Sequence, residues 1–131
     1  MKIRGVQIRF DCKNGEQFEA IGRFWDRMRV LCSGESLLGV GFGWQNDTLC
    51  YLIGTENGVS EGAAEALSTV FPSAIIAELQ LPDSGWKKYT ATADTLDVLY
   101  TEIYKDGSLD YEIERFDASG KAEIAIWRKG E

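Results

Sequence analysis

Three glutamates stand close together near the end of the chain, among aromatic and β-branched residues. Glu112 and Glu114 belong to one predicted strand, and Glu123 belongs to the strand that follows it. Side chains alternate between the two faces of a strand, so Glu112 and Glu114 share a face. An ionised carboxylate in apolar surroundings is unfavourable unless a cation or hydrogen-bond donors accompany it. These residues therefore predict a pocket for a positively charged molecule with a delocalised charge.

The length of the loop between these strands decides whether the third glutamate joins the other two. A four-residue loop, 118–121, predicts the pairs Phe116 with Glu123, Glu114 with Ala125, and Glu112 with Trp127. This register places all three carboxylates on one face rimmed by aromatic rings. A loop one residue shorter or longer moves Glu123 and Trp127 to the other face.

A solvated sheet face is the competing interpretation, because alternating polar residues usually mark the side of a strand that meets water. The glutamates would then pair loosely with nearby cations, which are Lys105, Arg115 and Lys121. Phe116 and Trp127 favour the pocket instead, since an exposed sheet face rarely holds two large aromatic side chains.

Aromatic side chains elsewhere in the sequence are candidates for the walls of the pocket. Tyr51 and Tyr104, together with Trp127, are the predicted walls, because a buried phenol keeps a polar group that needs a partner. Such rings can also stack on a flat cation. Phe24 and Trp25 lie centrally in an apolar helical stripe, which predicts that they belong to the core.

The elements that must position these residues follow one pattern twice: strand, helix, hairpin. The sequence predicts a single domain, 1–131, made of pseudo-repeats at about 1–55 and 73–131 with a connection at 56–72. Two such βαββ units predict an α+β fold, an antiparallel sheet with two helices on one side and a cleft between the halves. The predicted elements are strands 3–10, 38–44, 49–53, 73–81, 109–116 and 122–128, helices 16–31 and about 93–105, with Gly107 just past the end of the latter, and a helical turn at 61–67. Residues 86–89 are predicted to be a solvated loop.

Composition excludes several kinds of chemistry. The 131 residues include 14 Lys and Arg against 21 Asp and Glu, a formal net charge of −7, so we expect no direct nucleic-acid contact. Without histidine, no imidazole can act as a base. The cysteines Cys12, Cys32 and Cys50 predict buried free thiols, with no metal site and no cofactor. The chain has neither an apolar membrane-spanning segment nor the apolar core of a signal peptide, which predicts a cytoplasmic protein without a membrane partner.

Five short segments occur in the same order as in a known family. They are IGRFWDRM (21–28), GVGF (39–42), FPSA (71–74), IERFD (113–117) and EIAI (123–126). Together they resemble the gyrase-inhibitor-like (GyrI-like) small-molecule-binding domains, also found as effector-binding domains of AraC- and MerR-type multidrug regulators. The resemblance implies a duplicated βαββ fold whose cleft receives cationic, aromatic compounds. It also implies that Glu114 and Glu123 are the acidic residues of the site. The tyrosine usual in the family after the acidic residue is here Phe116.

These observations favour a stand-alone module that binds cationic or amphipathic aromatic molecules, as a sensor, a sequestering protein or an effector module in transcription regulation. Its ligand-binding residues would be Glu114, Glu123, Glu112, Tyr51, Tyr104 and Trp127. A hydrolase of reactive electrophiles is one alternative, with the same glutamates as acid or base and no separate catalytic residue assigned. A second alternative is an acidic module that binds a protein partner such as a topoisomerase.

Overall fold

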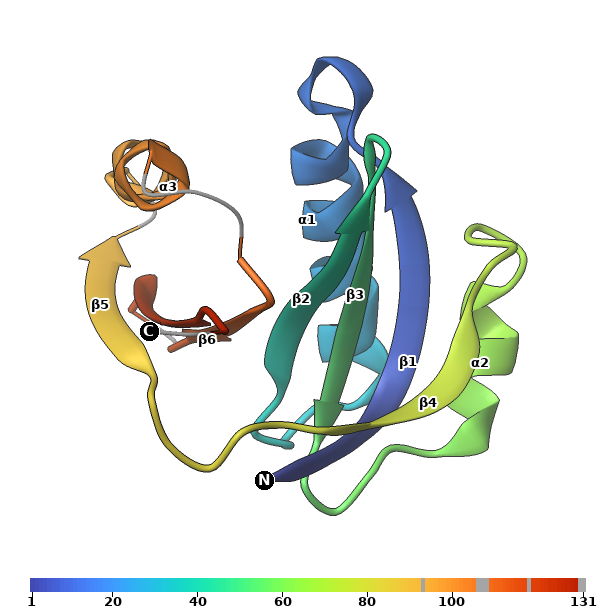
Figure 1. The fold of residues 1–131 in the computed structure, drawn as a ribbon. Helices are drawn as coiled ribbons and strands as arrows, with labels where there is room; N and C mark the ends of the chain where they lie inside the picture. Colours follow the sequence, from blue (N-terminus) through green and yellow to red (C-terminus); the bar gives the residue numbers. More distant parts are fainter. Residues whose placement is uncertain (93, 106–108, 118, 130–131) are drawn as a thin grey trace.

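Seven strands build one antiparallel sheet in the computed structural model, which describes residues 1–92, 94–105, 109–117 and 119–129 (Figure 1). The strand order is β4-β1-β3-β2-β6-β7-β5. The elements along the chain are β1 (Lys2–Asp11), η1 (Lys13–Gly15), α1 (Glu16–Leu31), β2 (Leu38–Gln45), β3 (Thr48–Thr55), α2 (Glu61–Leu67), β4 (Ile75–Gln80), β5 (Lys87–Thr92), α3 (Leu96–Lys105), β6 (Tyr111–Phe116) and β7 (Lys121–Trp127). The α+β fold with an antiparallel sheet is confirmed, and so is the order of its predicted helices; Gly107 lies outside the described residues.

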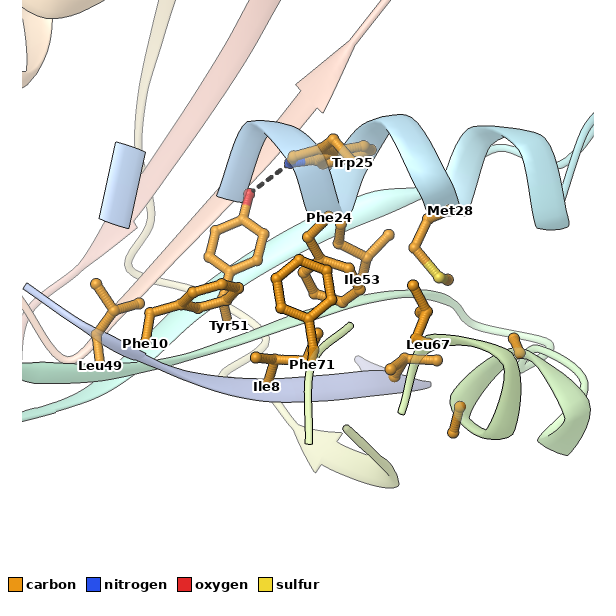
Figure 2. Close-up of a cluster of buried hydrophobic side chains, with 13 residues drawn as sticks. Ile8, Phe10, Phe24, Trp25, Met28, Leu49, Tyr51, Ile53, Leu67 and Phe71 are labelled. Atoms are coloured by element: carbon orange, nitrogen blue, oxygen red, sulfur yellow. Dashed lines mark hydrogen bonds between the residues drawn. The ribbon is translucent and has the colours of Figure 1, made fainter. Parts of the chain in front are cut away.

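Helix α1 forms because its apolar residues recur at helical spacing and one side is buried. It follows Gly15, whose φ of +74° suits a residue without a side chain. Phe24, Trp25 and Met28 are the buried residues of the helix. Figure 2 shows Phe24 and Met28 pointing from α1 toward the sheet, where they meet rings and aliphatic groups from β1 and β3. The Trp25 ring lies alongside the helix, with its nitrogen directed to the Tyr51 hydroxyl. This packing fixes α1 on the first half of the sheet.

Both long helices lie on the same face of the sheet. Tyr51 in β3 packs in the cluster that holds α1, whereas Ile124 in β7 packs with Tyr100 of α3. The cross-strand pairs link Tyr51 to Gly41, Gly41 to Glu112 and Glu112 to Ile126, and paired residues share a face. The two helices therefore flank one stretch of sheet.

The two halves of the sheet meet at a short seam between β2 and β6. Its four pairs are Gly39 with Glu114, Val40 with Ile113, Gly41 with Glu112 and Phe42 with Tyr111. The first half contains β1, β3 and β2, and the second contains β6, β7 and β5. Glu112 and Glu114 thus lie on β6, the strand that joins the halves.

The outer strands differ from the prediction in two ways. Residues 86–89 were predicted as a solvated loop, which is wrong, because β5 begins at Lys87 and pairs with β7. The two adjacent lysines conceal an alternation in which Tyr89 and Ala91 are half-buried. The predicted strand 73–81 exists as β4, but it pairs with β1 and not with a strand of the second half. The strands β4 and β5 are the two edges of the sheet, on opposite sides of Figure 1.

The predicted register of the last hairpin is wrong by one residue. Phe116 pairs with Ala122 and Arg115 pairs with Glu123. The turn closes early because the Asp117 backbone N–H donates to the Lys121 carbonyl at 3.0 Å. Gly120 adopts a φ of +84°, as a short hairpin loop requires. Residue 118 of the predicted loop lies outside the described residues.

Candidate functional site

A cavity of about 470 Å³ lies between α1 and α3, above the seam of the sheet. Its floor comes from β2, β3 and β6, and its sides come from the two helices. Carboxyl, phenol and indole groups line it together with aliphatic side chains. The lining includes Trp25, Trp44, Tyr51, Leu96, Tyr100, Tyr104, Glu112, Glu114 and Phe116.

Two carboxyl groups lie at the bottom of this cavity. Glu112 is 4% exposed and Glu114 is 7% exposed, so both are largely withdrawn from water. Their partners across the seam are Gly41 and Gly39, whose lack of side chains leaves room for the Trp44 ring and the Tyr51 hydroxyl. A Cβ on Gly39 would overlap the hydroxyl of Tyr51 and lie 2.8 Å from the Trp25 ring. Gly39 is therefore required by the close packing at the site.

A chain of hydrogen bonds holds Glu114. The Trp25 indole N–H donates to the Tyr51 hydroxyl at 2.9 Å, and that hydroxyl donates to Oε1 of Glu114 at 2.7 Å. The first of these bonds is the dashed line in Figure 2. Tyr51 is 1% exposed, so both of its bonds are shielded from water. Its O–H points at the carboxylate, because the indole N–H of Trp25 can only donate and an ionised carboxylate can only accept.

A second set of phenols comes from α3. The Tyr104 hydroxyl donates to Oε2 of Glu112 at 3.1 Å. Tyr100, one helical turn earlier, stacks on Tyr104 with ring centroids 5.9 Å apart. The Tyr100 hydroxyl is buried and makes no hydrogen bond of regular geometry among the described residues. It nevertheless lies close enough to both carboxyls to lower the pKa of each.

Burial changes the acidity of the whole group. Burial and, next, the neighbouring Glu114 carboxylate together raise the pKa of Glu112 to about 8, against the lowering effect of the two α3 phenols. Burial also raises the pKa of Glu114, while the phenols of Tyr100 and Tyr51 lower it. The two carboxyls interact and titrate as a pair, with the pKa of both raised. Burial likewise raises the pKa of Tyr51, Tyr100 and Tyr104, so these phenols remain donors at neutral pH.

The structure brings four of the six predicted site residues together: Glu112, Glu114, Tyr51 and Tyr104. It places Glu123 and Trp127 on the opposite face, as a consequence of the shorter loop. Glu123 is exposed and lines a separate cavity of about 400 Å³. The Trp127 indole donates to the Ser84 carbonyl at 3.1 Å.

Several aromatic residues of the cavity, Trp25 and Tyr100 among them, were not among the predicted walls. Trp25 was assigned to the core, and it does pack there, but its N–H also orients Tyr51. Tyr100 was passed over in favour of Tyr104. The signal for Tyr100 was present in the sequence, since residues four apart on a helix lie on the same side. The sequence carried no such signal for Trp25, because its hydrogen bond to Tyr51 joins segments that are distant in the chain.

The described residues offer no other obvious reactive centre. Among them, no three His, Cys, Asp or Glu side chains are grouped as a metal ion would need. Cys50 is buried, Cys12 and Cys32 are half-buried, and none of the three forms a disulfide. No helix within the described ranges has the length and apolar character to cross a bilayer.

Comparison with known proteins shows the fold. No family model and no curated protein sequence matches the chain. Its architecture is an α+β fold with one antiparallel sheet. SAV2435, solved with tetraphenylphosphonium bound, shares this fold with a TM-score of 0.61 at 13% identity, over 99% of this chain and 89% of that chain. A hydrolase from Listeria innocua aligns over 95% of this chain and 86% of its own, with a TM-score of 0.43 and 9% identity, too low to support an argument.

Proposed function

We propose that this protein binds lipophilic aromatic cations in the cavity between α1 and α3. The carboxylate of Glu114 carries the proposal: it is 7% exposed, and its hydrogen-bond donor is the neutral phenol of Tyr51. Neutral donors do not balance the negative charge of a buried carboxylate. A cation that also brings apolar surface is therefore stabilised beside it. The likeness to SAV2435, whose structure contains tetraphenylphosphonium, supports the same class of ligand.

The aromatic walls support a flat or propeller-shaped ligand. Trp25, Trp44 and Phe116 line the cavity beside the tyrosines. Such rings attract a cation with about 0.5–2 kcal/mol each. We propose that the protein acts as a stand-alone sensor or sequestering module for such compounds.

Tryptophan fluorescence can test this function, since Trp25 and Trp44 both line the cavity. Tetraphenylphosphonium should change the emission on binding, whereas tetraphenylborate, of the same shape and opposite charge, should not bind. Glu114→Gln should weaken tetraphenylphosphonium binding by at least about tenfold. Glu123→Gln is the matched control, because Glu123 is exposed on the other face of the sheet. Equal affinity for the two ions would refute the proposal.

Hydrolysis of a reactive electrophile is the second candidate function. Burial raises the pKa of Glu112 to about 8, so this carboxyl can donate a proton at neutral pH. Glu114 beside it can activate water or stabilise a developing positive charge. The test is turnover of an epoxide or cyclopropane compound, which should be lost in Glu112→Gln and unchanged in Glu123→Gln. Absence of turnover in the native protein would eliminate this candidate.

A further inference from the structure

Two carboxyl groups share one cavity, although one is enough to balance a singly charged ligand. Glu112 and Glu114 are two positions apart on β6 and therefore point to the same side of the sheet. Both line the cavity between α1 and α3. The following inference rests on the proposed function of this cavity, and it concerns the charge of the molecules that the cavity accepts.

The two carboxyls have different surroundings. Glu114 receives the Tyr51 hydroxyl from β3, deep beside α1. Glu112 receives the Tyr104 hydroxyl from α3, and Tyr104 is 42% exposed. Glu112 itself is only 4% exposed, but its hydrogen-bond partner reaches solvent, which gives a proton a route in or out of the cavity.

A third phenol, that of Tyr100, lies close to both carboxyls. The Tyr100 hydroxyl is buried and makes no regular hydrogen bond among the described residues, and the side chain is 8% exposed. A buried polar group of this kind costs free energy unless it gains a partner. Its position beside both carboxyls allows it to donate to either one when that group becomes ionised.

The charged groups on the surrounding elements are engaged elsewhere or lie at the edge. On α1, Arg29 pairs with Asp26 at 3.3 Å and covers the Trp25 ring with its guanidinium. After β7, Arg128 donates to the Ile103 carbonyl at 2.7 Å. On α3, Asp97 lines the cavity and adds negative charge. Positive charge at the carboxyls must therefore come mainly from the ligand.

We propose that Glu112 is the residue that sets the charge of the accepted ligand: it stays protonated when a monocation occupies the cavity and gives up its proton when a dication does. A monocation is balanced by Glu114 alone. A second positive charge stabilises the ionised form of Glu112, and Tyr104 and Tyr100 then donate to it. The cavity thereby takes aromatic dications as well as monocations, and the dication releases a proton to solvent.

Two probes of matched shape can test this inference. N-methyl-4-phenylpyridinium carries one positive charge, and methyl viologen carries two on a similar two-ring frame. Calorimetric titration at pH 7 in phosphate and in Tris measures proton release, because these buffers differ in their enthalpy of ionisation. Methyl viologen should release about one proton, since a pKa of about 8 leaves Glu112 mainly protonated at this pH. The monocation should release less than about a third of a proton.

Variants assign the proton to its residue. Glu112→Gln should abolish the extra proton release and shift the ratio of affinities toward the monocation by at least about tenfold. Glu123→Gln should leave both the proton release and the ratio unchanged. Equal proton release by the two probes in the native protein would overturn the inference and leave the proposed function unaffected. Failure of both probes to bind would refute the proposed function and this inference with it.

Discussion

The buried carboxyl of Glu112 should make the protein less stable as the pH rises, and Glu112→Gln should remove that effect. Glutamine has nearly the same shape as a protonated glutamate, so the variant tests charge with little change in volume. Burial raises the pKa of this group from 4.5 to about 8 in the folded protein. The folded state therefore binds a proton over a range in which the unfolded chain has lost it.

The sign follows from proton linkage. Between the two pKa values the folded protein holds more protons than the unfolded chain, so its stability falls as the pH increases. The loss begins near pH 4.5 and is complete just above pH 8. At about 1.4 kcal/mol for each pH unit, the effect amounts to a few kcal/mol and at most about 5 kcal/mol.

Chemical denaturation from pH 5 to pH 9 provides the measurement. Native protein and Glu112→Gln should be similar in stability near pH 5. At pH 9 the variant should be more stable by a few kcal/mol. Glu123→Gln corrects for the general loss of one negative charge, since Glu123 is exposed on the opposite face. Native and Glu112→Gln profiles that run parallel from pH 5 to pH 9 would refute the reasoning.

Three further substitutions test the packing around the site. Gly39→Ala should displace the Tyr51 hydroxyl and the Trp25 ring, with a cost of about 1–3 kcal/mol in unfolding free energy and an altered tryptophan emission spectrum; an unchanged melting temperature would contradict it. Tyr51→Phe should cost about 1–3 kcal/mol, because the Trp25 N–H and Glu114 each lose a buried partner, and denaturation at pH 7 would detect the loss. Gly22→Ala should instead stabilise the protein by about 0.5–1 kcal/mol, since a Cβ there meets no atom within 4 Å inside a helix; a lower stability would show that this side of α1 is packed more closely than described.

Local patterns in the sequence were enough to predict most elements. The helical stripe that contains Phe24 and Trp25 predicts α1, and the alternation of Leu38, Val40 and Phe42 predicts β2. These signals survive because burial of a periodic apolar face is the main source of stability of each element. The α+β architecture follows from their order along the chain.

The site was predicted less completely, because it depends on pairing between segments. Glu112 and Glu114 share a face by alternation within one strand, and the structure brings them together in the cavity. Glu123 required the correct loop length, which Asp117 and Gly120 set by hydrogen bonding and a positive φ. The sequence shows that both residues favour a turn. Composition alone does not decide whether the loop has three or four residues.

The short seam between β2 and β6 gives a bound molecule a second effect. Only four cross-strand pairs are described there, and the cavity spans the seam from α1 to α3. A molecule bound in this cavity would contact both halves and hold them together. Opening of either half would have to break its contacts with the other, so occupancy should couple their motions and make the chain unfold more nearly as one cooperative unit.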